Sequence, residues 1–291
     1  MRFHRDDLRA LTTDATLLDL NQRLQRHDLP FDGGHVTWRC LGEGPPLVLL
    51  HGGHGSWAHW VRNLDPLARR FRVCVADLPG YGDSSAPTSP TLASLLEATL
   101  QTLDALVGAG TPIALAGFSF GGLVAARLAG QRGAVSELAL LGPAGHGGPR
   151  RPRGDLRSWR EAQASNDKAA LRQIMRHNLQ LHMLASPADD RALAIHTQAC
   201  LRTRFHSKRI SRAGGLADSL RGLTCPVLLV WGEHDVTATP PELAPLLAAQ
   251  CLHAQTHVLA NAGHWVQYEA AEQINVLLAN WFVPPGSASG P

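Results

Sequence analysis

The sequence predicts an α/β protein with a mostly parallel central sheet, helices on both faces and one inserted helical segment. Three observations lead to this prediction. Short apolar runs alternate with helix-like segments over most of the 291 residues. A glycine-flanked serine stands where one apolar run turns into a helix. The strand pattern is interrupted once, between residues 142 and 212, where only helix-like segments occur.

The composition is that of an ordinary globular protein, with 44% hydrophobic and 18% charged residues. The formal net charge of +3 is too small and too dispersed to indicate nucleic-acid binding. No apolar run approaches the roughly 20 residues that a membrane span requires, and the N-terminus lacks the apolar segment of a signal peptide. We therefore expect a cytoplasmic protein with a small-molecule substrate, no nucleic-acid partner and no membrane partner; a homodimer stays open.

The five cysteines are odd in number and include no C-x-x-C pair. Such a pattern argues against a disulfide framework or a zinc site and is typical of a reduced cytosolic protein. Four of them stand beside apolar residues, so we expect them to be small core side chains. We expect neither a metal nor an organic cofactor.

The N-terminal segment carries leucines at helical spacing between residues 8 and 26. We interpret residues 1–30 as an N-terminal helical extension that packs on the rest of the protein. A helix that binds a partner is the alternative.

Residues 31–145 form the first part of the predicted core. The run from Pro46 to Leu50 is continuously apolar, as in a buried parallel strand. Gly52 and Gly53 follow it, and glycines at the carboxyl end of such a strand let backbone N–H groups point into the crevice where ligands bind. The expected strands lie within residues 31–44, 46–51, 71–77, 112–116 and 135–141, and the expected helices at 57–70, 92–107 and 123–129.

The alternation breaks at Gly142, where a Gly/Pro-rich basic linker begins. Residues 146–212 then show helix-like patterns only, and we interpret them as a helical cap inserted into the core. The core resumes over residues 213–283, with strands expected at 226–231 and 256–260 and helices at 241–250 and 270–281. Residues 284–291 are expected to form a flexible tail.

The serine turn reads Gly117-Phe-Ser119-Phe-Gly121. A strand that turns at once into a helix leaves no room for side chains beside the turn, and glycines two residues before and after the serine meet that need. Such a turn lifts the Ser119 hydroxyl clear of the sheet, above the N-terminus of the next helix. A Gly-rich turn with an idle serine is the alternative.

A serine hydroxyl needs a base beside it and an acid to orient that base. If the sheet is parallel, these partners should follow later strands. Asp235 follows the strand at 226–231, and His264 follows the strand at 256–260. Glu233 could replace Asp235, and Asp235 could instead cap a helical turn. The loop after the strand at 135–141 holds no carboxylate that could compete for this role.

Two other groups of residues have simpler interpretations. His51 stands at a strand end and could be mistaken for a metal ligand, but no second ligand at suitable spacing accompanies it, so we expect a structural histidine. The basic run that begins at Arg150 and continues through Arg151, Arg153, Arg157 and Arg160 is expected to be a solvated face. A landing site for anionic substrates is the alternative for this run.

Taken together, the His51-Gly-Gly loop, the turn after Asp77, Gly117-x-Ser-x-Gly121, Trp231-Gly-Glu-His-Asp235 and Gly263-His264-Trp265 resemble the α/β-hydrolase superfamily. Ser56-Trp-Ala-His-Trp-Val-Arg-Asn-Leu-Asp-Pro-Leu and Gly263-His-Trp-Val-Gln-Tyr-Glu269 are similar to the meta-cleavage-product hydrolases, which cut carbon–carbon bonds. The resemblance implies that residues 156–212 cover the active site as a lid. It also implies an oxyanion hole at the backbone N–H groups of Gly53 and Phe120.

The same resemblance suggests substrate contacts at Gly52, Phe118, Arg202 and Trp265. Two features differ from the family. Its members commonly have asparagine directly before the nucleophile, where this chain has Phe118. They also use a lid arginine to hold a substrate carboxylate, for which Arg202 or Arg204 could serve. The choice between an ester and a carbon–carbon bond therefore stays open.

These observations predict a serine hydrolase that uses Ser119, His264 and Asp235 on a small carbonyl substrate and forms an acyl-enzyme. The scissile bond would belong to an ester or to a diketone-type acid. A general carboxylesterase and a ligand-binding relative without turnover are the alternatives. Enzymes of this fold that process haloalkanes or epoxides are disfavoured, because they carry aspartate where Ser119 stands.

Overall fold

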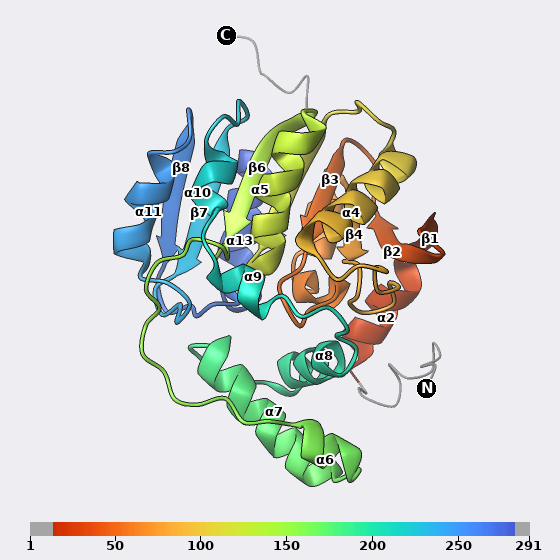
Figure 1. The fold of residues 1–291 in the computed structure, drawn as a ribbon, viewed down its shortest axis with the longest axis vertical. Helices are drawn as coiled ribbons and strands as arrows, with labels where there is room; N and C mark the ends of the chain where they lie inside the picture. Colours follow the sequence, from red (N-terminus) through yellow and green to blue (C-terminus); the bar gives the residue numbers. More distant parts are fainter. Residues whose placement is uncertain (1–13, 283–291) are drawn as a thin grey trace.

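The computed structural model describes residues 14–282, and its central element is an eight-stranded sheet with the order β1-β2-β4-β3-β5-β6-β7-β8 (Figure 1). β1 is antiparallel to β2, and β2 is antiparallel to β4; all other neighbours are parallel. The strands are β1 (Gln25–Phe31), β2 (Gly34–Leu41), β3 (Pro46–Leu50), β4 (Arg72–Asp77), β5 (Ile113–Phe118), β6 (Val135–Leu141), β7 (Val227–Gly232) and β8 (Ala254–Leu259). The predicted mostly parallel sheet is confirmed.

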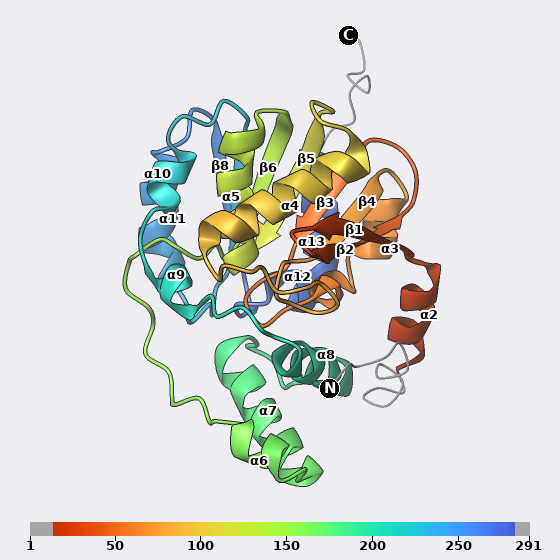
Figure 2. The same ribbon diagram turned by 45° about the vertical axis from the view of Figure 1, so that its right-hand side comes forward.

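Helices cover both faces of this sheet (Figure 2). On one face, α4 (Leu92–Val107), α5 (Phe120–Arg132), α10 (Leu216–Leu220) and α11 (Pro240–Ala248) share a hydrophobic cluster with the sheet. On the other face, α2 (Ala15–Arg23), α3 (Leu64–Ala68) and α13 (Ala271–Trp281) share a second cluster. Successive strand residues alternate between the two clusters, as the two-residue period of a strand requires.

The N-terminal extension is helical only in part. Helix α2 begins after Asp14, whose side chain accepts the N–H of Leu17 at 2.9 Å, and it buries Leu17 and Leu20 on the core. The prediction of a helical extension through residue 30 is wrong at its end, because residues 25–31 form the edge strand β1. A two-residue Asp32-Gly33 turn with positive φ at both positions joins β1 to β2, as in a tight hairpin. The helix expected at residues 8–13 lies outside the described residues, as do the residues of the expected tail, 284–291.

The helix expected at residues 57–70 is interrupted. A 3₁₀ helix, η1 (Trp57–Trp60), is followed by the separate helix α3 (Leu64–Ala68). The restart at Leu64 places Pro66 in the first turn of α3, where the missing N–H of proline costs nothing. A continuous helix from residue 57 would have placed Pro66 in its interior.

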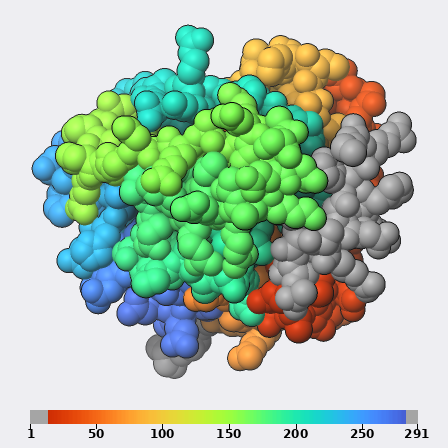
Figure 3. All heavy atoms as spheres, turned by 90° about the horizontal axis from the view of Figure 1, so that it is seen from below, coloured from red at the N-terminus to blue at the C-terminus, as the bar shows by residue number. Residues whose placement is uncertain are grey.

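The helical insertion between β6 and β7 contains α6 (Arg160–Ala164), α7 (Lys168–His182), α8 (Asp190–Leu201) and α9 (Lys208–Arg212). Helices α6, α7 and α8 lie below the lower edge of the sheet in Figure 1, and seen from that side their spheres cover the centre of the molecule (Figure 3). Met175, Leu179 and Met183 carry the hydrophobic cluster of the sheet into this layer. We call residues 146–212 the cap.

None of the helices within residues 14–282 has the length and apolar character needed to cross a bilayer.

Candidate active site

Ser119 stands on the sharp turn between β5 and α5. Its backbone adopts φ 53° and ψ −116°, a strained conformation for a residue with a side chain. The turn is tightly packed: a Cβ at Gly117 would collide with the carbonyl of Gly121, and a Cβ at Gly121 would collide with the carbonyl of His51. The glycines are therefore needed for close backbone approach, as the sequence pattern predicted, and the Ser119 side chain remains partly exposed.

The structure brings together Ser119, His264 and Asp235, which follow β5, β8 and β7. The Ser119 Oγ lies 2.9 Å from His264 Nε2, and His264 Nδ1 lies 2.8 Å from Asp235 Oδ2. An ionised carboxylate only accepts hydrogen bonds, so His264 donates from Nδ1 and leaves Nε2 free to accept the Ser119 hydroxyl proton. Asp235 is fully buried and His264 is 3% exposed, so water competes little for these bonds.

Thr237 holds the second oxygen of Asp235. Its backbone N–H and its hydroxyl donate to Asp235 Oδ1 at 2.7 and 2.8 Å. Burial acts to raise the pKa of Asp235, but the neighbouring His264 and the hydrogen bonds from His264 and Thr237 outweigh it, so the pKa lies below its ordinary value. The acid is thereby kept ionised.

Glu233, the alternative acid, lies elsewhere. Its side chain is 52% exposed, and its carboxylate accepts the N–H of Asn261 at 3.1 Å. The structure thus places Asp235, and not Glu233, on the histidine.

Gly53 and Phe120, the expected oxyanion-hole residues, lie next to each other at the serine turn. Phe120 is the first residue of α5, so its N–H is among those at the start of the helix that have no acceptor within the helix. A Cβ at Gly53 would lie 3.8 Å from the Phe120 Cβ, so the two residues are neighbours. The N–H of Gly52 points instead to His59 Nδ1 at 3.3 Å, and a Cβ at Gly52 would approach the Ser119 Cβ to 3.1 Å.

His51 uses both ring nitrogens within the protein. Its Nδ1 donates to the Gly52 carbonyl at 2.7 Å, and its Nε2 accepts the N–H of Leu78 at 2.9 Å. This arrangement fixes the loop after β3 to the loop after β4, which agrees with the structural role expected from the sequence. Within residues 14–282, no three His, Cys, Asp or Glu side chains gather as a metal site.

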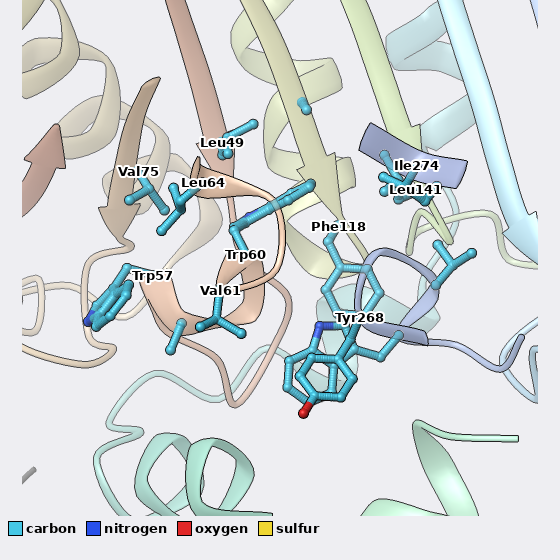
Figure 4. Close-up of a cluster of buried hydrophobic side chains, with 14 of the residues drawn as sticks. Leu49, Trp57, Trp60, Val61, Leu64, Val75, Phe118, Leu141, Tyr268 and Ile274 are labelled. Atoms are coloured by element: carbon cyan, nitrogen blue, oxygen red, sulfur yellow. The ribbon is translucent and has the colours of Figure 1, made fainter. Parts of the chain in front are cut away.

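Phe118 and Trp265 are fully buried beside the histidine. The Phe118 ring lies 4.9 Å from the His264 ring, and its place at the end of β5 is visible in Figure 4. Trp265 donates from Nε1 to the His59 carbonyl at 2.9 Å and stacks on Tyr268 at 4.3 Å. Phe118 therefore packs against His264, and Trp265 packs against His59 and Tyr268.

Arg202, expected as a substrate contact, has another partner. Its guanidinium lies 2.6 Å from Asp83, a residue that also pairs with Arg26 and the buried Arg39. Arg204 donates to the carbonyls of Gly82 and Ser84. The charge of Arg202 is therefore already matched by Asp83 on the loop after β4.

Several residues at the site gave no signal in the sequence. Gly142 is one: a Cβ there would lie 3.0 Å from Asp235 Oδ2 and 3.1 Å from His264 Cε1. His182, the last residue of α7, is a second. Its ring lies 5.7 Å from the His264 ring, and its Nδ1 is buried without a hydrogen-bond partner among residues 14–282. Burial and the neighbouring His264 hold the pKa of His182 well below its ordinary value. These contacts depend on tertiary packing that no local pattern encodes.

The basic linker of the cap lies near the same site. Burial and the charge of Arg212 lower the pKa of Arg150, while Asp235 acts in the opposite direction, so Arg150 is close enough to feel the charge of the acid. Arg150 donates to the Ser211 carbonyl at 3.3 Å and Arg153 to the Gly154 carbonyl at 3.0 Å. Neither makes an ion pair with a carboxylate among the described residues.

Residues 45–271 match a family model described as the alpha/beta hydrolase fold. A dihydrolipoyllysine-residue acetyltransferase component of an acetoin cleaving system from Pseudomonas putida is 33% identical over 84% of the chain, which spans 65% of that relative's length. A pimeloyl-[acyl-carrier protein] methyl ester esterase from Vibrio campbellii is 29% identical over 79% of the chain and 91% of the relative.

Two further similarities concern hydrolases of carbon–carbon bonds. A 2-hydroxy-6-oxononadienedioate/2-hydroxy-6-oxononatrienedioate hydrolase from Pseudomonas putida is 30% identical, over 84% of the chain and 91% of the relative. The solved structure of a meta-cleavage product hydrolase from Pseudomonas fluorescens superposes with a TM-score of 0.71 and 22% identity, covering 90% of this chain and 98% of that one. The resemblance to meta-cleavage-product hydrolases predicted from the sequence is thereby confirmed.

Proposed function

The chain belongs to the α/β-hydrolase family, with esterases and carbon–carbon hydrolases among its relatives, and from this premise we propose that it is a serine hydrolase of a small carbonyl substrate. Ser119 is the nucleophile, His264 the general base and Asp235 the group that orients it. The observation that carries the proposal is the continuous row of hydrogen bonds, 2.9 Å from Ser119 to His264 and 2.8 Å from His264 to Asp235. This row stands on a strained turn that exposes the hydroxyl.

The proposed reaction has two steps. His264 Nε2 takes the Ser119 proton as Oγ attacks the carbonyl carbon, and the resulting oxyanion accepts the N–H groups of Gly53 and Phe120. One such donor typically stabilises the transition state by about 3 kcal/mol. His264 then gives the proton to the leaving group and the acyl-enzyme forms. Water, deprotonated by His264, attacks the acyl carbon, and Ser119 leaves with the returned proton.

The scissile bond is an ester C–O bond in the version of the proposal that we favour. Phe118 supports this choice, because the position before the nucleophile offers a fully buried aromatic ring and no polar group. The carbon–carbon version requires that the substrate first become a keto tautomer, so that carbon can leave as the conjugate base of a ketone. No polar side chain at position 118 is present to handle the dienol.

One observation favours an acidic substrate, and with it the diketone-type acid as second candidate. Arg150 and Arg153 are partly buried, lack carboxylate partners within residues 14–282, and Arg150 feels the charge of Asp235. A cation held in this way near Asp235, as Arg150 is, would attract a substrate carboxylate. We propose that the cap, residues 146–212, closes over the substrate and supplies these charges.

Parallel assays test the proposal and separate its versions. The purified protein is given p-nitrophenyl acetate and a ring-fission dienoate under the same conditions. We expect hydrolysis of the ester, and a loss of at least about a thousandfold in Ser119→Ala. Ser158→Ala, at an exposed serine of the cap, is the matched control and should keep full activity. Faster turnover of the dienoate would select the carbon–carbon version.

Activity that survives in Ser119→Ala, or a wild-type protein that turns over neither substrate, would contradict the proposal. In the second case the alternative is a ligand-binding relative without turnover. That alternative predicts saturable binding of small carbonyl compounds, measured by calorimetry, with no product.

A further inference from the structure

We propose that the Ser207 hydroxyl, contributed by the cap, is a third hydrogen-bond donor to the oxyanion, and that Tyr81 orients it. This inference rests on the proposed serine-hydrolase function. Ser207 would be a catalytic residue, because its hydroxyl would touch the reacting oxygen. Tyr81 would be a positioning residue, because it would act through Ser207.

The first observation is where the Ser207 hydroxyl lies. A Cβ at Gly53 would be only 2.7 Å from Ser207 Oγ, closer than its 3.8 Å approach to the Phe120 Cβ. The hydroxyl therefore borders the glycine whose N–H is a proposed oxyanion donor, on the side where Phe120 also lies. Ser207 is 4% exposed, so it is shielded from bulk water.

The second observation is that the Ser207 hydroxyl does not cap the helix that follows it. Ser207 precedes α9, the position where a serine side chain usually accepts an N–H from the first turn. Here its side chain makes no such capping bond, although its carbonyl accepts the N–H of Ser211 at 2.8 Å. The hydroxyl is thus available to another partner.

The segment that carries Ser207 is anchored to the core. The N–H groups of Arg204 and Phe205 both reach the Gly80 carbonyl, at 2.8 and 3.2 Å. The Phe205 ring is 2% exposed and lies 6.0 Å from the rings of both Phe120 and Tyr81. A hydroxyl on such a segment is held ready before substrate arrives, which is what transition-state stabilisation requires.

Tyr81 supplies the third observation. Its side chain is fully buried, and among the described residues its hydroxyl makes no hydrogen bond of full geometry but interacts with the Ser207 hydroxyl. A buried hydroxyl without a good hydrogen bond is destabilised, so such groups usually pair with another polar group. Ser207 is the polar side chain that faces it: burial raises the pKa of Tyr81, and the Ser207 hydroxyl opposes that rise. Tyr81 therefore stays protonated and able to donate.

The number of protons on the two hydroxyl groups determines which of them can donate to the substrate oxygen. A serine hydroxyl has one proton and two lone pairs, and a tyrosine hydroxyl has one proton. If Tyr81 donates to Ser207 Oγ, the Ser207 proton is left to point toward Gly53 and the substrate oxygen. As negative charge develops on that oxygen, the Ser207 hydrogen bond strengthens, and no proton leaves Ser207.

Ser207→Ala tests the inference, with Ser211→Ala, one turn later on α9, as the matched control. We expect kcat to fall tenfold to a hundredfold in Ser207→Ala with KM nearly unchanged, because the bond forms mainly in the transition state. The affinity of a trifluoromethyl ketone, which forms an oxyanion on Ser119, should fall by the same factor. The affinity of the product acid should not change, and Ser211→Ala should match wild type.

Tyr81→Phe is tested in the same assay and in combination with Ser207→Ala. If Tyr81 acts only through Ser207, the double variant should be no slower than Ser207→Ala alone. Additive losses would contradict the positioning role.

Two outcomes would overturn the inference itself. One is a Ser207→Ala enzyme with wild-type kcat. The other is an equal loss of affinity for the ketone and for the product acid, accompanied by a lower melting temperature, which would indicate a packing role. A wild-type protein without any Ser119-dependent activity would instead overturn the proposed function, so the two failures are distinguishable.

Discussion

At the scale of single residues, Gly142 shows how closely the backbone approaches Asp235 and His264, the proposed catalytic pair. It follows β6 with φ +50°, and a Cβ there would press on Asp235 Oδ2 and His264 Cε1 at 3.0 and 3.1 Å. Such contacts are tighter than side-chain packing normally allows, so the glycine leaves space that the acid and base need.

The expected consequence is that Gly142→Ala slows the enzyme by displacing the pair. We expect kcat to fall about tenfold or more, because small misplacements of catalytic groups have large effects on rate. Gly133→Ala is the matched control: it has φ +73°, so it carries the same backbone strain, but nothing lies within 4 Å of its added Cβ. Steady-state kinetics and melting temperatures of both variants check this prediction. Equal activity in the two variants would show that the contact at Gly142 is unimportant.

The site residues that follow the ends of strands were predictable from the sequence. Ser119, Asp235 and His264 each follow a predicted parallel strand, and the carboxyl ends of such strands meet at one edge of the sheet. Residues that reach the site from the cap could not be found in this way, because their positions depend on how the cap folds back. Ser207, which we propose as an oxyanion donor, was not predicted for that reason. Arg202 was expected at the substrate, whereas the structure pairs it with Asp83.

Glu269 joins two elements that carry the site. It ends α12 (Val266–Glu269), and its carboxylate accepts the N–H of Gly263 at 2.7 Å, directly before His264. The same carboxylate accepts the N–H groups of Ala185 and Ser186 in the cap, at 3.0 and 2.8 Å. The Trp265 N–H also reaches the Met183 carbonyl at 2.8 Å. These hydrogen bonds therefore connect the loop that carries His264 to the cap.

We expect Glu269→Gln to loosen this junction. The amide keeps one accepting oxygen but turns an NH₂ group toward backbone donors, and hydrogen bonds to charged acceptors are worth about 1.5–3 kcal/mol each. Amide hydrogen exchange should speed up at residues 185, 186 and 263, and kcat should fall several-fold. Glu272→Gln, at an exposed glutamate three residues later, is the control. Unchanged exchange at all three amides would show that Glu269 does not hold the His264 loop and the cap together.

The elements themselves were predictable where one physical rule dominated. Continuous apolar runs located the buried parallel strands, because both of their faces are covered by helices. Strand β1 was not predicted, because its residues are mostly polar and partly exposed and the leucine spacing before it favours a helix. The break in the helix expected at residues 57–70 was indicated by Pro66, because proline is disfavoured in the interior of a helix.

Buried histidines give the whole molecule a common response to acid. Burial lowers the pKa of four of these histidines, His51, His59, His182 and His196. For His196, on the cap helix α8, burial and the nearby His54 lower the pKa to about 4. An unfolded chain would protonate this ring near pH 6.5.

The sign of the effect follows from proton binding. Between the unfolded and folded pKa values the unfolded chain binds a proton that the folded one does not, so the free energy of unfolding falls as the pH falls below 6.5. His196 alone should account for a loss of about 2 kcal/mol between pH 8 and pH 5. Urea denaturation at both pH values measures this loss. It should shrink in His196→Gln and persist in His234→Gln, a change at an exposed ring; the same pH dependence in both variants would contradict the prediction.

The arrangement of the cap on the sheet is a property of the whole chain. The sequence indicated a helical insertion after β6, but not that its middle would rest on the loop of His264 while its last segment rests beside Gly53. Both contacts join residues far apart in the sequence, and their geometry depends on side-chain packing across the sheet edge. The structure of the core is therefore predictable from local sequence patterns, whereas the position of the cap depends on packing between residues far apart in the sequence.

The central claim is that Ser119 is a nucleophile activated by His264. Intact-mass analysis after treatment with a fluorophosphonate tests it most directly, followed by peptide mapping of the adduct. We predict one adduct per chain, located on Ser119, that forms far more slowly in His264→Gln and is absent in Ser119→Ala. An adduct that persists in Ser119→Ala, or a wild-type protein that stays unlabelled, would contradict the account.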